Sequence, residues 1–191
     1  MNKTLEFFYD YVSVYSYLAD SQLAQLAGAD IVYRPMFLGA VMQATGNRPP
    51  GTIEAKRKYL HDDIARWAER YQLSLTMNPH FPQNTLNALR LAIVAQKEGC
   101  FAAVHRRLFD AMWVDQANLE DTEFLQKLAG DSGLGAQASM RATASQAVKE
   151  QLKSNTEEAV SRGVFGAPTF FLGKQMFFGN DRFDFIRQAI G

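Results

Sequence analysis

The stretch FFYDYVSVYSYLA, residues 7–19, joins an aromatic run to a helical pattern. Residues 3–11 are rich in aromatic and apolar side chains, which favour a strand. After Ser13 the apolar residues recur at helical intervals, and Gly28 is a suitable residue to end the helix. The chain is therefore predicted to run from a strand directly into a helix.

Further strands and a further helix are predicted after residue 28 and near the C-terminal end of the chain. ADIVYRP, residues 29–35, predicts a second strand, and a strand–helix–strand order with so short a crossover predicts a parallel, right-handed βαβ unit. Near the C-terminal end, two apolar runs within residues 167–179 flank a Gly-Lys pair and predict a hairpin. A last short helix is predicted after it, with Asn180 or Asp181 as its N-cap.

The middle of the chain has no convincing strand pattern. Apolar side chains recur there at helical spacing over residues 53–71, 86–93, 101–112, 122–129 and 147–160. The order βαβ, helical block, ββα predicts an α/β, thioredoxin-like fold with a helical insertion. Residues 1–35 and 164–191 are predicted to form the thioredoxin-like domain, and residues 36–163 an inserted all-helical domain.

Composition narrows the class of function. The 191 residues are 47% hydrophobic and 21% charged, with a formal net charge of zero. This predicts a globular protein whose chain as a whole has no charge signature for nucleic acid or an anionic membrane. No apolar run reaches membrane-spanning length, and no signal-peptide core is visible. A single cysteine favours a reducing, cytoplasmic location, and the three histidines lack metal-ligand spacing.

Ser13 is the first candidate for chemistry, because it stands at the predicted mouth of a helix. Ser16 follows three positions later, in the spacing that redox proteins use for two cysteines. Hydroxyls cannot do redox chemistry, which argues against a dithiol oxidoreductase. The Ser13 hydroxyl is either an ordinary N-cap or a hydrogen-bond donor to the thiolate of a bound ligand, in the positive field of the helix N-terminus. Ser16 is interpreted as structural.

Pro168 and the pair Asn180-Asp181 are further candidates. Pro168 either begins a strand in the ordinary way or follows a cis bond, in which case the exposed Ala167 backbone would pair with an extended peptide. Asn180 and Asp181 are either ordinary caps or the holders of an amino-acid head group. A thiol, a peptide backbone and a zwitterionic end group are together what glutathione presents.

Four motifs carry a resemblance to a known family. They are FYDYVSVYSYLA (8–19), GNRPPGTIEAKRKYL (46–60), NPHFPQNTLNALR (78–90) and GVFGAPTFFLGKQMFFGNDR (163–182). In this order they resemble the 2-hydroxychromene-2-carboxylate isomerase family, DsbA-like thioredoxin-fold proteins related to the kappa-class glutathione transferases. The resemblance spans nearly the whole chain. It implies glutathione as cofactor and a homodimer as the assembly.

The resemblance also implies roles for particular residues. Ser13 matches the family's catalytic serine, which interacts with the glutathione sulfur. The remaining matches are implied glutathione contacts: Tyr15 in the same loop, Ala167 and Pro168 at the cis-proline, Asn180 and Asp181 at the γ-glutamyl end, and Asn47 and Lys56 in the helical insert that closes over glutathione or substrate.

The implied activity is glutathione-dependent isomerisation between 2-hydroxychromene-2-carboxylate and trans-o-hydroxybenzylidenepyruvate, in aromatic-compound catabolism, through reversible thiolate addition. Two alternatives stay open: a kappa-like glutathione S-transferase that conjugates an electrophile, and a weakly catalytic glutathione-binding protein. Val14 departs from the family pattern, which commonly has proline there. Proline pre-sets the first helical position, so valine predicts a somewhat softer loop.

Overall fold

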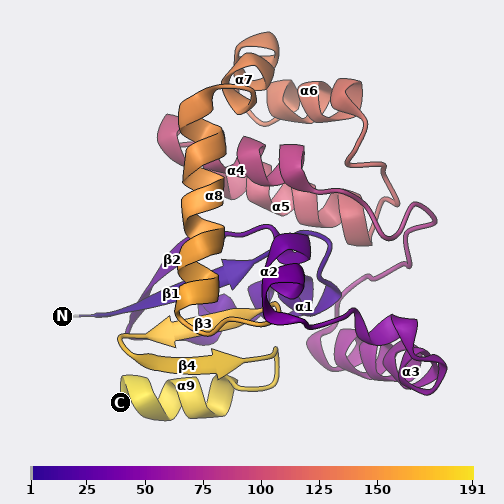
Figure 1. Cartoon of the computed structure of the whole chain (residues 1–191), viewed down its shortest axis with the longest axis vertical. Coiled ribbons are helices and arrows are strands. Elements are labelled where there is room, and N and C mark those ends of the chain that lie inside the picture. Colours follow the sequence, from indigo (N-terminus) through magenta and orange to yellow (C-terminus); the bar gives the residue numbers. More distant parts are fainter. Residues whose placement is uncertain (1) are drawn as a thin grey trace.

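The N-terminal and C-terminal segments of the chain together form a four-stranded mixed sheet (Figure 1). The computed structural model describes residues 2–191. The strands are β1 (Lys3–Tyr9), β2 (Ala29–Pro35), β3 (Thr169–Leu172) and β4 (Gln175–Phe178). Their spatial order is β2-β1-β3-β4, so the first strand is central although it comes first in sequence.

Strand pairing confirms the predicted topology. β1 and β2 run parallel, with Lys3 opposite Ala29. β3 runs antiparallel to β1, with Phe170 opposite Phe7, and β4 is antiparallel to β3. A parallel βαβ unit thus shares its sheet with a C-terminal hairpin, which is the thioredoxin-like arrangement. The predicted domain boundaries, 1–35 with 164–191 and 36–163, stay a prediction.

The crossover between β1 and β2 is less regular than predicted. Helix α1 (Val14–Asp20) ends at Ser21, and a short 3₁₀ turn (Leu23–Gln25) follows. The prediction of one helix as far as Gly28 is therefore wrong. The Ser21 hydroxyl donates to the Leu18 carbonyl at 2.7 Å, the type of local bond by which serine competes with continued helix.

Only helices and turns occur between β2 and β3, as the absence of strand patterns predicted. Five of these helices coincide with predicted helical stretches, and two short ones, α2 and α7, were not predicted. The helices are α2 (Leu38–Thr45), α3 (Glu54–Tyr71), α4 (Leu86–Glu98), α5 (Phe101–Trp113), α6 (Thr122–Asp131), α7 (Ala136–Thr143) and α8 (Gln146–Ser161), with a 3₁₀ turn at Pro50–Thr52. Across residues 2–191, none of the helices combines the length and apolar character that crossing a membrane requires.

The last helix, α9 (Phe183–Ile190), begins later than predicted. Its N-cap is Arg182, so neither Asn180 nor Asp181 caps it, and that prediction is wrong. Gly179 has a positive φ of 106°, and its amide N–H donates to the Pro168 carbonyl at 3.0 Å. Because this bond holds the chain in a turn after β4, α9 begins only at Phe183.

Alternate side chains of β1 build hydrophobic cores on both faces of the sheet. Phe7 lies in the larger core, and its ring stacks on that of Phe170 with centroids 5.1 Å apart. This core continues into α1, α4, α5 and α9. Phe8 points to the opposite face, where it packs with Phe171 in a smaller core that includes residues of α8. Since every β1 residue from Phe7 to Tyr9 is fully buried, the strand fixes where the β1–α1 loop begins.

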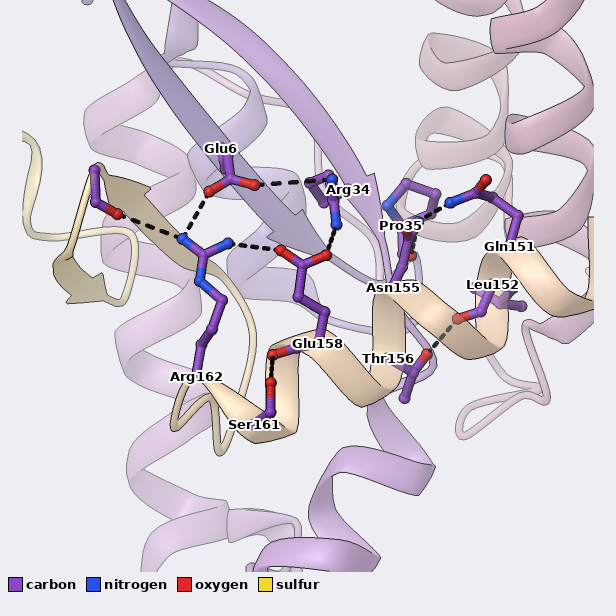
Figure 2. Close-up of polar contacts among 11 residues, drawn as sticks. Glu6, Arg34, Pro35, Gln151, Leu152, Asn155, Thr156, Glu158, Ser161 and Arg162 are labelled. Atoms are coloured by element: carbon purple, nitrogen blue, oxygen red, sulfur yellow. Dashed lines mark hydrogen bonds and ion pairs between the residues drawn. The ribbon is translucent and has the colours of Figure 1, made fainter.

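A charged cluster ties the C-terminal end of α8 to the sheet (Figure 2). Arg162 contacts Glu6 of β1 at 2.7 Å and Glu158 of α8 at 2.9 Å, and Arg34 of β2 pairs with both carboxylates. The Arg162 guanidinium also lies 3.7 Å from the centroid of the Phe171 ring. Because Arg162 precedes the loop that leads to Pro168, this cluster anchors the loop at its start.

We expect Arg162→Met to lower the free energy of unfolding by about 1–2 kcal/mol, because the two half-buried carboxylates lose one of the two cations that they share. Adding Glu6→Gln to that variant should recover part of the loss, since one of the facing charges is removed. Urea unfolding monitored by circular dichroism measures both values.

The control is Lys153→Met, which breaks the exposed Lys153–Glu157 pair on the same helix. It should leave the urea midpoint nearly unchanged. An equal loss in the two single variants would show that the cluster has no special role.

Candidate active site

Ser13 lies at the start of α1, where the sequence placed it. It is the N-cap residue, with an extended backbone, and its Oγ accepts a hydrogen bond from the Ser16 N–H at 3.1 Å. The same hydroxyl donates to the Ala167 carbonyl at 3.1 Å. Only 8% of Ser13 is exposed. The cap interpretation is thus confirmed, and the bond to Ala167 brings together two site residues that are 154 positions apart.

The Ala167–Pro168 peptide bond is cis, which confirms one of the two readings of this motif. Ala167 is half-buried. Its amide N–H makes no hydrogen bond within the described residues, while its carbonyl accepts the proton of Ser13. A backbone with one free donor and one acceptor beside a helix N-terminus has the form needed to pair with an extended peptide.

Asn180 and Asp181 follow directly on the Gly179–Pro168 bond and so lie next to this loop. Asn180 is 3% exposed, and its Nδ2 has no hydrogen-bond partner in the described part of the chain. An amide group buried without a partner is unusual, and it is satisfied when a ligand or water supplies an acceptor. The exposed carboxylate of Asp181 pairs with Arg182 at 2.5 Å.

Tyr15 connects the site to α3. Its hydroxyl donates to Asp63 at 2.8 Å, and Tyr59 donates to the other oxygen of the same carboxylate at 3.2 Å. Burial, followed by the hydrogen bond to Asp63, raises the pKa of Tyr15 well above its ordinary value, so this hydroxyl stays protonated. The charge of Asp181 makes a smaller contribution in the same direction.

Helix α3 itself is weakly buried. Among its residues only Ile64 and Ala68 are buried, although the helix is 18 residues long. Besides the Tyr15–Asp63 bond, Tyr71 donates to the Asn180 carbonyl at 3.1 Å. Figure 1 shows α3 lying apart from the pair α4 and α5. Polar contacts with the candidate site therefore contribute much of what holds α3 in place.

The two predicted site residues of the helical insert, Asn47 and Lys56, lie in different surroundings. Asn47 Nδ2 donates to the Phe165 carbonyl at 2.7 Å, which ties the loop before α3 to the loop that carries Ala167. The Lys56 side chain is exposed and makes no hydrogen bond or ion pair with any residue from 2 to 191. Direct contacts thus join Ser13 to Ala167 and tie Asn47 to the loop that carries Ala167, and α3 contacts both Tyr15 and Asn180. Lys56 lies outside these contacts.

Asp10 is a key residue that the sequence analysis missed. Its carboxylate is fully buried and accepts hydrogen bonds from Val12 N–H at 3.1 Å, Leu38 N–H at 2.9 Å and the Thr85 hydroxyl at 2.5 Å. Burial raises the pKa of Asp10, and these hydrogen bonds oppose the rise. Asp10 thus holds the loop before Ser13 to the starts of α2 and α4. The sequence feature that could have revealed Asp10 is that it is the one acidic residue within an otherwise apolar and aromatic run.

The other side of this loop is held by aromatic residues. Trp113 Nε1 donates to the Tyr11 carbonyl at 2.8 Å, and the Tyr11 hydroxyl lies 2.9 Å from His105 Nδ1. His105 Nε2 lies 3.0 Å from the Asp20 carboxylate at the end of α1. Buried side chains therefore fix both ends of α1 and the loop that leads to Ser13.

Other parts of the surface give weaker evidence for a functional site. Within residues 2–191, no three histidine, cysteine or acidic side chains come together in a way that could hold a metal ion. A hollow of about 390 Å³ lies between α1, α5 and the segment after α3, lined by residues such as Tyr17, Ser74 and Arg106, and it contains none of the predicted site residues. Cys100 is half-buried.

The chain matches a known family model. The DSBA-like thioredoxin domain matches residues 4–191, almost the whole chain. This defines the class: a protein with a DsbA-like thioredoxin domain, in which Ser13 and Ser16 lie at the start of α1.

Comparison with individual proteins identifies the family within this class. A 2-hydroxychromene-2-carboxylate isomerase of Sphingobium xenophagum is 35% identical over 198 residues, covering 100% of this chain and 99% of that protein. A solved structure of 2-hydroxychromene-2-carboxylate isomerase has a TM-score of 0.89 at 30% identity, over 98% of this chain and 94% of that one. Glutathione S-transferase kappa 1 of Rattus norvegicus is 27% identical over 206 residues, 99% of this chain and 91% of that protein. The chain belongs to the 2-hydroxychromene-2-carboxylate isomerase family, and it is an enzyme of the kind that these isomerases and kappa-class transferases represent.

We expect Asp10→Asn to lower the free energy of unfolding by about 1–3 kcal/mol, because the new amide places two N–H donors among three donors, where the carboxyl group has at most one. The raised pKa of Asp10 means that the folded state keeps this proton to higher pH than the unfolded state does. The stability of the wild type should therefore fall as pH rises through that pKa. The variant lacks this fall, so its deficit should shrink over the pH range in which Asp10 ionises in the folded wild type.

Urea unfolding across that pH range measures the difference. Asp30→Asn, at an exposed carboxylate of β2 that bonds to the Asn2 side chain, is the control and should follow the wild-type pH curve. A deficit of Asp10→Asn that grows with pH would contradict the assigned direction.

Proposed function

We propose that this enzyme binds glutathione beside Ser13 and uses it to interconvert 2-hydroxychromene-2-carboxylate and trans-o-hydroxybenzylidenepyruvate. The observation that carries the proposal is the contact between the Ser13 hydroxyl and the cis-proline loop at the N-terminus of α1. The names of the relatives, isomerases at up to 35% identity and kappa-class transferases below 30%, favour the same chemistry.

Three features of the site fit three parts of glutathione. The N-terminus of α1, with the Ser13 hydroxyl, fits an anionic sulfur. The free N–H and the carbonyl of Ala167 fit the backbone of an extended peptide. The buried, unpartnered Nδ2 of Asn180 fits an acceptor at the γ-glutamyl end, and the nearby Asp181 carboxylate fits an ammonium.

Ser13 has one task in this proposal, which is to favour the ionised form of the ligand's sulfur. A hydroxyl donor and the unpaired N–H groups of a helix start both stabilise an anion relative to its neutral acid. Each unit by which they lower the thiol pKa corresponds to about 1.4 kcal/mol. Since the N-cap bond from Ser16 uses a lone pair of Oγ and leaves its proton free to be donated, capping and thiolate binding are compatible.

Opening of the cyclic hemiketal to a phenol and a ketone frees the chain that carries the double bond. Bound glutathione would supply a sulfur nucleophile whose addition to a conjugated carbon makes that bond rotatable and whose loss after rotation restores it. The chain's own residues would orient the peptide and hold the sulfur at α1. No strong side-chain base is needed for this chemistry.

A kappa-like transferase is the second candidate, since the same site serves both reactions and kappa-class relatives span 99% of this chain. The two differ in whether the sulfur leaves the substrate again. The assembly as a homodimer, the cytoplasmic location and the role in aromatic catabolism stay predictions.

Turnover of 2-hydroxychromene-2-carboxylate, followed by absorbance with and without glutathione, tests the proposal. We expect the wild type to approach equilibrium only when glutathione is present, with no net consumption of thiol. Stoichiometric thiol loss in the presence of an electrophile would instead favour the transferase. Equal turnover without glutathione would contradict the cofactor assignment.

We expect Ser13→Ala to bind glutathione with a thiol pKa raised by about 1–2 units, because a charge-assisted hydrogen bond to the sulfur is lost. Thiolate absorbance of the bound ligand, recorded over a pH titration, measures this. Ser16→Ala is the matched control, because Ser16 contacts Ser13 through its backbone N–H, which the substitution keeps. An unchanged thiol pKa in Ser13→Ala would remove the serine from its role.

A further inference from the structure

The two outer strands of the sheet, β2 and β4, differ in how their free edges are protected (Figure 1). On β2 the backbone carbonyls of Tyr33 and Pro35 accept hydrogen bonds from the side chains of Gln96 and Asn155, at 2.9 and 3.0 Å. The same strand contains two charged residues and ends in proline. Charges, proline and covering side chains are the usual means by which an edge strand avoids pairing with another chain.

β4 has none of these protections within residues 2–191. Its sequence, QMFF, contains neither charge nor proline. Leu172 and Gln175 flank the two-residue turn and so form a hydrogen-bonded pair, and such pairs alternate along an antiparallel ladder. Met176 and Phe178 therefore direct their N–H and C=O groups away from β3, where no described residue bonds to them.

Helix α9 does not cover this edge, because it lies beneath β3 and β1. Phe183 at its start packs on Phe170 of β3, with ring centroids 5.7 Å apart, and the Ala189 carbonyl near its end accepts from Lys3 Nζ of β1 at 2.9 Å. The edge of β4 is left open to solvent.

Exposed apolar side chains lie along the same edge. Met176 and Phe178 are each 39% exposed, and so is Phe165, whose ring centroid is 4.5 Å from that of Phe178. A group of exposed apolar side chains beside unpaired backbone groups is typical of a surface that contacts another protein.

β4 is complementary to a second copy of itself. When two antiparallel β4 strands are related by a two-fold axis at Phe177, Met176 of each strand faces Phe178 of the other. Every outward N–H and C=O group of Met176 and Phe178 then has a hydrogen-bond partner. The exposed side chains of these two residues also become cross-strand neighbours, so the apolar surface is covered together with the backbone.

The same register brings opposite charges together. Lys174, at the tip of one hairpin, comes beside the Asn180–Asp181 turn of the other. Lys174 is exposed and forms no ion pair within the described chain, and the Asp181 carboxylate is also exposed. A register shifted by two residues would instead place Lys174 opposite Phe178 or opposite Arg182, so charge favours the two-fold axis at Phe177.

We propose that two copies of this chain join their sheets edge to edge through antiparallel β4 strands, with Lys174 of each beside the partner subunit's Asp181. The family resemblance predicts a homodimer, and the open edge of β4 supplies the surface. The inference does not depend on glutathione chemistry. Because Asp181 also belongs to the candidate site, each site in this dimer lies next to the hairpin tip of the other subunit.

The first test changes the backbone of β4 and measures the dimer dissociation constant by sedimentation equilibrium. Met176→Pro removes an N–H that has no partner in the single chain, and an edge strand tolerates proline at such a position. In the dimer each copy loses a donor, so the dissociation constant should rise at least about tenfold. Met176→Thr, which keeps the N–H, is the control and should cause a clearly smaller rise. Circular dichroism shows whether both variants are folded.

The second test changes the charges. Lys174→Glu should raise the dissociation constant about three- to tenfold at low salt and less at high salt. Adding Asp181→Lys should reverse most of this rise, because the opposite charges are restored with their positions exchanged. Lys149→Glu, at an exposed lysine near the start of α8, makes the same change of charge away from the edge and should leave the dissociation constant unchanged.

A wild type that is monomeric at every soluble concentration would overturn the inference. So would a dimer in which Met176→Pro weakens association no more than Met176→Thr, because its subunits do not pair through the backbone of β4. If Met176→Pro fails to fold, the charge variants decide: no rise with Lys174→Glu, or no recovery with Asp181→Lys, would place the interface elsewhere. Loss of glutathione-dependent turnover in the wild type would contradict the proposed function and leave this inference standing.

Discussion

The buried carboxylate of Asp10 is the interaction on which the geometry of the site depends. It accepts three hydrogen bonds, from the loop that leads to Ser13, from the start of α2 and from the residue before α4. Buried charge is costly unless it is satisfied in this way, so the carboxylate tolerates little displacement of its donors. One side chain at the end of β1 thereby sets where the helical insertion stands relative to the serine.

The site is assembled from segments that meet only in the folded chain. Ser13 follows the central strand, Ala167 follows the helix that the Arg162 cluster anchors, and Asn180 follows the hairpin that pairs with β1. Each segment is held by a different kind of force. Buried apolar side chains hold the strand, ion pairs and ring stacking hold the end of α8, and backbone hydrogen bonds hold the turn at Gly179.

Local sequence patterns were sufficient to predict the helices and strands in which buried residues recur at a regular spacing. The sheet, the five longer insertion helices and the cis bond at Pro168 were all accessible from spacing, from breakers or from the family resemblance. Helix α2 was missed because its position depends on distant contacts, namely Leu38 with Asp10 and Phe37 with the Thr156 hydroxyl. The cis bond before Pro82 was missed as well, since nothing in an X-Pro pair states its isomer.

For the same reason the partners of individual side chains escaped prediction. Ser13 could be read as a cap, because a cap is a local feature, but the bond to Ala167 spans 154 positions. Asp181 and Asn180 were misassigned as caps because the turn at Gly179 consumes two further residues before α9 begins.

Helix α3 contributes only two buried residues, and polar contacts around the site supply much of its attachment. Changing its outer residues therefore costs little folding free energy, in contrast to changes in β1 or at Asp10. Over evolutionary time such a helix is free to diversify, so new surface chemistry can arise along α3 while the turn at Ser13 and the sheet beneath it are inherited intact.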